Sequence, residues 1–155
     1  MTSSDTTAGS AGAGAAAGAG AAIGAGAAIG AGSVVGVGTD VVDIARFEAI
    51  LERRPNLAAR LFSAVELGYA SGLARPAPTL AGRFAVKEAV MKTLGVGLGA
   101  VDWQDISVAR LPGGRPELTV GGRAGRLAEE MGVGNWFVSI SHTHTVASAV
   151  VVAVG

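Results

Sequence analysis

The sequence contains no cysteine, and this absence excludes disulfide bonds, thiolate catalysis and zinc sites built on cysteine. Such a chain is compatible with a reducing compartment, and we expect a cytoplasmic protein. An excess of charge is also absent, because twelve Lys and Arg residues balance twelve Asp and Glu residues. No overall charge therefore draws the chain to nucleic acid or to an anionic membrane, so we expect neither as a partner. An acidic partner must be met by a local basic surface.

Large side chains are scarce in the first 33 residues, which consist mostly of Ala and Gly. Ordering a backbone costs on the order of 1–2 kcal/mol per residue, and methyl groups bury too little apolar surface to offset that cost. We therefore predict a disordered tail over residues 1–33 and one compact domain over residues 34–155. The first basic residue is Arg46, so the positively charged start of a secretory signal is missing, and the Gly-rich stretch lacks the flanking anchors of a membrane span.

Two familiar nucleotide-binding motifs are absent as well. Gly95, Gly97 and Gly99 follow a predicted helix but lack the Gly-Lys-Ser/Thr ending of a P-loop, and the Gly-Val-Gly at 36–38 falls short of the dinucleotide fingerprint. Ordinary turn chemistry explains such glycines as readily as a close approach of phosphate to the backbone does.

The most informative residues present are two acids on separate segments. Asp40 lies near the end of a buried strand predicted over 34–42, and Glu88 lies on a helix predicted over 79–94. Mg²⁺ takes one or two protein carboxylates and leaves its other positions to water and substrate phosphate, so this pair suits a magnesium ion that carries phosphates. Each acid also has an ordinary interpretation, Asp40 as a turn or cap residue and Glu88 as half of a surface pair with Lys92.

Three cations share the helix with Glu88, namely Arg83, Lys87 and Lys92. The spacing of four between Glu88 and Lys92 makes them neighbours on one helix face. We expect the cations to surround the carboxylate, so that a bound pyrophosphate meets metal and ammonium together.

Another helix, predicted over 43–54, has one apolar and one basic face. Arg46 and Arg53 lie on the basic face, where simple solvation is the usual explanation of charge. Asp43 has the position of a helix cap, and Ser63 with Glu66 forms a capping-box pattern that opens a further short helix.

Both histidines of the chain, His142 and His144, fall at the last predicted turn. Metal binding by this pair needs a third soft ligand that the sequence does not show. A hydrogen-bonded strand end is a simpler explanation of His142.

Strands dominate the second half of the chain. Alternating apolar residues and turn residues predict a helix over 122–131 and strands over 105–111, 117–120, 136–141 and 146–154. We therefore predict an α+β fold in which a largely antiparallel sheet wraps around the long helix.

Five motifs, in matching order and spacing, resemble the holo-acyl-carrier-protein synthase family, a group of 4'-phosphopantetheinyl transferases. They are GVGTDVVDIARFEAIL (36–51), GRFAVKEAVMKTLGVGLG (82–99), WQDISV (103–108), GGRPEL (113–118) and VSISHT (138–143). The resemblance implies a 4'-phosphopantetheinyl transferase-like fold for the domain. It also implies magnesium-dependent transfer of the 4'-phosphopantetheine arm of coenzyme A to a serine of an apo acyl carrier protein, with release of adenosine 3',5'-bisphosphate. Such enzymes serve fatty acid biosynthesis, although fatty-acid and polyketide carriers fit this sequence equally.

On this resemblance, Asp40 and Glu88 hold the magnesium ion. Lys92 neutralises a phosphate from the opposite side, and Gly95 lets phosphate approach its backbone. We assign Glu88 as the general base that receives the serine proton, either directly or through a metal-bound water. Asp43 is the alternative base, although capping alone explains its position.

The resemblance also implies binding roles for residues outside the acid pair. Arg83 and His142 bind the ribose 3'-phosphate of coenzyme A, and Arg46 and Arg53 dock the acidic carrier protein. Family members of this kind are homotrimers with active sites at subunit interfaces, so we expect the same assembly. In such a trimer Asp40 and Glu88 can come from different subunits.

Two other functions stay open at this point. One is a catalytically silent subunit that binds carrier protein with the same fold, against which the joint presence of Asp40, Glu88, Lys92 and His142 argues. The other is a magnesium-dependent nucleotide pyrophosphatase that uses water as the nucleophile. Turnover of coenzyme A without a carrier would distinguish it.

Overall fold

The structure is a computed structural model that describes residues 32–155, so the predicted disordered tail lies almost entirely outside the described residues. In chain order its elements are β1 (Val34–Asp43), α1 (Ile44–Arg53), α2 (Leu57–Leu61), α3 (Ala64–Ser71), α4 (Ala77–Thr93), the 3-10 turn η1 (Trp103–Asp105), β2 (Ile106–Arg110), β3 (Pro116–Val120), α5 (Gly122–Glu130), β4 (Asn135–His142) and β5 (Val146–Val154). Within this part of the chain, none of the helices combines the length and hydropathy that crossing a bilayer requires.

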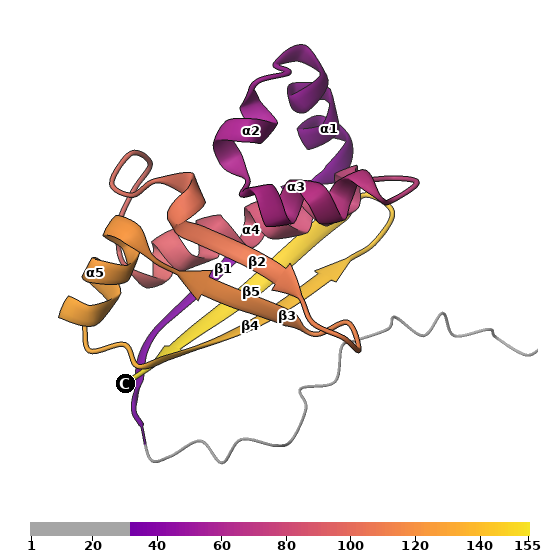
Figure 1. The fold of residues 1–155 in the computed structure, drawn as a ribbon. Helices are drawn as coiled ribbons and strands as arrows, with labels where there is room; N and C mark the ends of the chain where they lie inside the picture. Colours follow the sequence, from indigo (N-terminus) through magenta and orange to yellow (C-terminus); the bar gives the residue numbers. More distant parts are fainter. Residues whose placement is uncertain (1–31) are drawn as a thin grey trace, which may run out of the picture.

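The long helix α4 lies between two antiparallel sheets (Figure 1). One sheet has the strand order β1-β5-β4, and the other is the hairpin of β2 and β3. The predicted α+β fold, with antiparallel strands around the long helix, is confirmed. The strands form two separate ladders instead of one continuous sheet.

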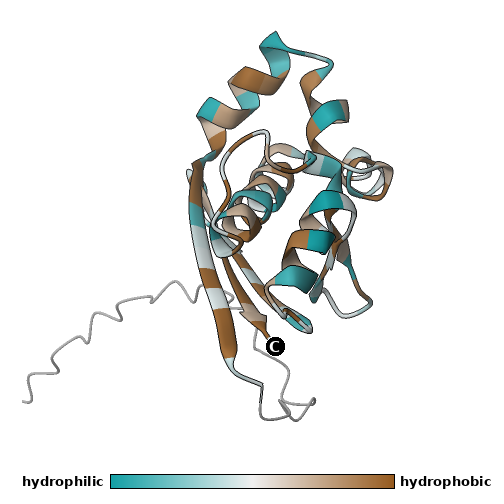
Figure 2. Cartoon of the chain, turned by 90° about the vertical axis from the view of Figure 1, so that its left-hand side faces the viewer, coloured by the Kyte–Doolittle hydropathy of each residue, from teal (hydrophilic) through white to brown (hydrophobic). Residues whose placement is uncertain are grey.

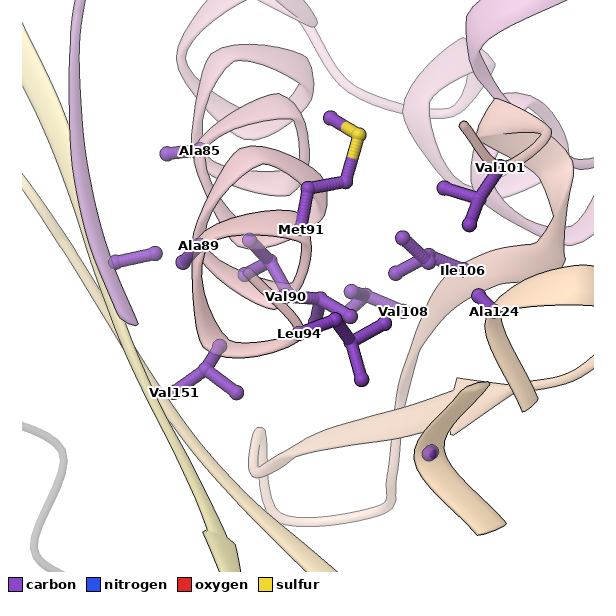
Figure 3. Close-up of a cluster of buried hydrophobic side chains, with 13 residues drawn as sticks. Ala85, Ala89, Val90, Met91, Leu94, Val101, Ile106, Val108, Ala124 and Val151 are labelled. Atoms are coloured by element: carbon purple, nitrogen blue, oxygen red, sulfur yellow. The ribbon is translucent and has the colours of Figure 1, made fainter. Parts of the chain in front are cut away.

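The main core forms where α4 meets both sheets (Figure 3). Ala85, Ala89 and Val90 of α4 are completely buried, with Val151 of β5 on one side and Val108 of β2 on the other. Burying each valine side chain contributes about 1.5–3 kcal/mol, so this cluster fixes α4 between the sheets.

A second core cluster joins α1, α2 and α3 to the first turns of α4. Its large members include Ile44, Phe47, Leu61, Phe62 and Leu80. The rings of Phe47 and Phe62 meet edge to face with their centroids 6.3 Å apart. The three small helices therefore have a packed interior of their own.

Two glycines of β1 allow α4 to lie directly against the strand. A Cβ atom on Gly38 would overlap the carbonyl oxygen of Ala89, and one on Gly36 would lie 2.9 Å from the side chain of Thr93. Only residues without a side chain fit at these two positions. This close approach of the two backbones brings residues of α4 close to Asp40.

Helix caps follow the predicted pattern. Asp43 accepts a hydrogen bond from the backbone N of Arg46 at 2.7 Å at the start of α1. Ser63 and Glu66 form the complete capping box of α3. The short elements α2 and η1 were not predicted, because five and three residues are too few to show a helical period.

Asp105 lies in the turn η1, although the sequence predicted it at the start of a strand. Its Oδ2 atom accepts hydrogen bonds from the backbone N atoms of Arg123 at 2.9 Å and Ala124 at 3.3 Å. This carboxylate therefore caps α5 from a distant part of the chain, which an apolar pattern cannot reveal.

The outer face of the β1-β5-β4 sheet is apolar and exposed. Val37 of β1, Val152 of β5 and Phe137 of β4 lie in register across it, and Val41 and Val150 extend the same face. Figure 2 shows the long hydrophobic stretches on the strands of this sheet. The prediction that β1 is a buried strand is therefore wrong for the side chains on its outer face, which are exposed in the single chain.

Candidate active site

An ion pair joins β1 to the end of α4. The Nζ atom of Lys92 donates to Oδ1 of Asp40 at 2.8 Å and to the backbone oxygen of Thr39 at 2.9 Å. The Lys92 side chain is 52% exposed and that of Asp40 is 17% exposed. An ammonium group that solvent can reach therefore lies against two oxygen atoms of β1.

Glu88 lies on the same side of α4, one turn before Lys92. Burial raises the pKa of the Glu88 carboxyl, and the charge of Asp40 raises it further, while Lys92 opposes both effects. The two acids are therefore close enough to repel each other. The structure brings Asp40, Glu88 and Lys92 together at one site.

The donor set at this site suits magnesium. Among residues 32–155, no group of three or more His, Cys, Asp or Glu side chains gathers to enclose a metal ion. A magnesium ion needs only one or two carboxylates, because water and substrate phosphates fill its other positions. Two mutually repelling carboxylates, one already paired with a cation, offer the negative charge that such an ion needs.

Lys87 does not belong to the site, although it precedes Glu88 in the sequence. Its side chain is completely buried, and its Nζ atom donates to Oε2 of Glu66 at 2.9 Å, to the backbone oxygen of Trp103 at 3.0 Å and to that of Ile106. A buried ammonium with these partners cannot contact a phosphate. The prediction that three cations surround Glu88 is therefore wrong for Lys87, and it is wrong for Arg83 as well, which is 6% exposed on the same side of α4.

Arg83 faces the same way as Lys87. Its Nε atom donates to the backbone oxygen of Val108 at 3.1 Å, and its guanidinium lies over the ring of Tyr69, 4.7 Å from the centroid. Burial lowers the pKa of Arg83, and the charge of Glu66 opposes that change. Within one chain Arg83 thus faces β2 and α3, away from Asp40, and its contact with a 3'-phosphate stays a prediction.

His142 and Gly95 lie at opposite ends of α4. His142 is exposed at the end of β4, two residues after Ile140, whose side chain lies where a Cβ atom on Gly82 would be. Gly95 follows α4 with a φ of 68°, and a Cβ added there would meet no atom within 4 Å. The predicted end of the helix at Gly95 is confirmed, and the space beside it is open.

Arg46 and Arg53 are exposed on α1, as the sequence predicted. The Nε atom of Arg53 donates to the backbone oxygen of Ala49 at 2.9 Å, which holds the side chain along the helix. A shallow hollow lies beside it, lined by Ile50, Arg53 and Arg54. Arg54, the last residue of the helix predicted over 43–54, was not among the residues that the sequence assigned to the basic face, and it follows the end of α1.

These features suit chemistry at a phosphate group, and comparison with known proteins points the same way. A family model described as the 4'-phosphopantetheinyl transferase superfamily matches residues 36–151. A holo-[acyl-carrier-protein] synthase from Moorella thermoacetica is 50% identical over 111 residues, which cover 72% of this chain and 87% of that protein.

Solved structures show the same relationship. The crystal structure of a holo-acyl-carrier-protein synthase from Plasmodium yoelii matches with a TM-score of 0.72 and 29% identity, over 81% of this chain and 98% of that one. The Helicobacter pylori holo-[acyl-carrier-protein] synthase in complex with coenzyme A matches with a TM-score of 0.66 and 31% identity, over 76% of this chain and 98% of that one. The chain belongs to the 4'-phosphopantetheinyl transferase superfamily and is an enzyme of its holo-[acyl-carrier-protein] synthase group.

Proposed function

We propose that this enzyme transfers the 4'-phosphopantetheine arm of coenzyme A to a serine of an apo acyl carrier protein, with magnesium held by Asp40 and Glu88. The serine oxygen attacks the β-phosphorus of coenzyme A, and the bond from that phosphorus to the bridging oxygen breaks. Adenosine 3',5'-bisphosphate leaves with that oxygen. The observation that carries this proposal is the meeting of Asp40, Glu88 and Lys92 at one site.

Asp40 and Glu88 provide the negative charge that binds the metal. When bound, magnesium supplies charge stabilisation to the pyrophosphate as the leaving phosphate departs. The ammonium of Lys92 is exposed to solvent and neutralises a phosphate oxygen beside the acids.

Glu88 is also the general base in this proposal. Burial and the charge of Asp40 raise the pKa of its carboxyl, and a carboxylate with a raised pKa is a stronger proton acceptor than an ordinary one. The proton of the attacking serine passes to Glu88, directly or through water.

Arg83 and His142 bind the ribose 3'-phosphate of coenzyme A. A guanidinium can offer paired hydrogen bonds to phosphate. His142 is exposed at the end of β4, and β4 contacts α4 at Gly82, the residue before Arg83. Gly95 admits phosphate close to its backbone at the other end of α4.

The carrier protein docks on α1 through Arg46 and Arg53. The chain has no net charge, so an acidic partner depends on local basic groups such as these. The apolar Ile50 beside Arg53 adds a hollow that a partner side chain can fill. Reversing the charge with Arg53→Glu should raise the carrier concentration needed for half-maximal transfer at least tenfold, with little change in kcat. An unchanged carrier dependence would remove Arg53 from the docking surface.

We further propose a homotrimer with active sites at subunit interfaces, acting in the cytoplasm in fatty acid biosynthesis. The support within the chain is the exposed apolar face of the β1-β5-β4 sheet, because faces of this kind usually mark a protein contact. Contact with neighbouring subunits at this face would also increase the buried surface of a small domain.

Mass spectrometry of an apo carrier protein incubated with coenzyme A, Mg²⁺ and the enzyme tests the reaction. We expect a mass gain equal to one phosphopantetheine arm, which disappears with a chelator or with a carrier whose acceptor serine is alanine. No gain on several carriers would favour a silent binding subunit. Cleavage of coenzyme A without any carrier would favour a nucleotide pyrophosphatase.

A further inference from the structure

Glu66 and Lys87 form an ion pair that is completely buried. Their carboxylate and ammonium groups lie 2.9 Å apart, and both side chains are 0% exposed. The ring of Phe62 covers the ammonium, with its centroid 5.5 Å from Nζ. The two residues are 21 positions apart, so the pair connects α3 to α4.

The pair also binds the backbone of the surrounding elements. Glu66 accepts from the backbone N of Ser63 at 2.8 Å and from that of Val108 in β2 at 3.2 Å. Lys87 donates to backbone oxygens in η1 and β2. Within residues 32–155, no buried side-chain nitrogen or oxygen lacks a hydrogen-bond partner. Four elements are therefore tied together at one point on α4.

Stability alone does not explain such a pair. Removing two charges from water costs several kcal/mol each, and well-packed apolar residues in the same space are often at least as stabilising. The pair fixes the orientation of α4, because its hydrogen bonds can all form at only one rotation of the helix about its axis. Neighbouring residues lie about 100° apart around a helix, so fixing Lys87 also fixes the side of α4 from which Glu88 projects.

In the sequence, Glu88 lies between two residues that attach α4 to its neighbours. Lys87, immediately before it, is tied to α3 and β2, while Ala89, immediately after it, lies against Gly38 of β1. The first contact fixes the rotation of the helix, and the second fixes its distance from the strand. Together they set where the Glu88 carboxylate points.

We propose that the Glu66–Lys87 pair is a positioning device that aims Glu88 at Asp40. This inference rests on the proposed role of Glu88 at the metal. Neither residue of the pair touches substrate, since both are buried on the side of α4 that faces β2 and α3. Their effect on the reaction acts through Glu88.

The test is binding of Mn²⁺ in the presence of coenzyme A, followed through the spin-resonance signal of free Mn²⁺. Lys87→Met should weaken Mn²⁺ binding at least tenfold, the scale on which residues that orient metal ligands act. The double variant Glu66→Gln/Lys87→Met leaves no buried charge without a partner. Its melting temperature should therefore recover relative to Lys87→Met while its Mn²⁺ binding stays weak. Recovery of both together would overturn the proposal, as would normal Mn²⁺ binding by Lys87→Met.

Two controls complete the experiment. Leu61→Ala removes a buried side chain from the second core cluster and should lower the melting temperature without changing the Mn²⁺ dissociation constant. Equal weakening by Leu61→Ala would show that lost stability alone is responsible, and the inference would fail. Glu88→Gln must itself weaken Mn²⁺ binding if the proposed function is right. Normal binding by Glu88→Gln would overturn the proposed function, whereas a defect confined to Glu88→Gln would overturn only the positioning role.

Discussion

The Nζ atom of Lys92 lies 2.8 Å from Oδ1 of Asp40, the carboxylate that we assign to magnesium. Lys92 therefore holds one of the oxygens that the ion would use. Because the Lys92 side chain is 52% exposed, its ammonium would move into solvent if magnesium took that oxygen. The released ammonium is then free for a substrate phosphate.

Replacing Lys92 with methionine should change metal binding and transfer in opposite directions. Calorimetry without coenzyme A should show tighter Mg²⁺ binding to Lys92→Met, because the competing ammonium is gone. Transfer should fall about a hundredfold, since a phosphate contact is lost. Lys92→Arg, which keeps the charge, is the matched control and should not gain Mg²⁺ affinity. Weaker Mg²⁺ binding by the methionine variant would contradict the competition.

Glu88→Gln should abolish most of the transfer while the protein stays folded. Losing a preorganised electrostatic contact of this kind costs about a hundredfold in rate. The same mass measurement on the carrier protein gives the rate, and circular dichroism checks the fold. Turnover near that of the unmodified enzyme would reject both roles of Glu88.

The raised pKa of Glu88 also predicts how the protein responds to pH. The folded state binds the Glu88 proton more tightly than the unfolded state, so the ionised carboxylate destabilises the fold at neutral pH. Glu88→Gln should therefore melt a few degrees higher at pH 7. That gain should vanish below pH 4.5, the ordinary pKa of the group, where both states are protonated. A lower melting temperature of the glutamine variant at pH 7 would contradict the sign of this shift.

Charge on the outer sheet face should disrupt the proposed trimer. Val37 on β1 is 59% exposed, and Val65 on α3, outside that face, is 62% exposed. Val37→Glu should lower the mass seen by light scattering, whereas Val65→Glu should leave it unchanged. A fully active monomer in either the unmodified protein or Val37→Glu would refute active sites shared between subunits.

A single methyl group on Gly38 should separate the two acids. Its Cβ would overlap the Ala89 carbonyl oxygen, so α4 must move away from β1. Overpacking of this kind typically costs about 1–3 kcal/mol, and Gly38→Ala should lose both stability in urea and transfer activity. Gly68→Ala is the control, because a Cβ added there meets no atom within 4 Å. Equal effects of the two substitutions would show that the close approach is not required.

The sequence predicted most of the fold because local patterns carry it. Alternating apolar residues located the strands, and the caps at Asp43 and Ser63 located the starts of α1 and α3. The motif resemblance pointed to Asp40 and Glu88, which the structure then brought together.

What the sequence could not reveal depends on contacts between distant residues. Glu66 is a visible capping residue, but its pairing with Lys87 depends on how α3 packs against α4. The valines of β1 indicated a buried strand, since the pattern cannot show that only one side is covered within a chain. The ion pair of Lys92 with Asp40 likewise spans 52 positions and exists only because Gly38 lets the helix approach.

The two separate core clusters have a consequence for redesign. Ile44 and Phe47 anchor α1 in one cluster, while the central turns of α4, the helix that carries Glu88, belong to the other. Val42 and Trp103 pack against both clusters, so a redesign of α1 should leave these two residues in place.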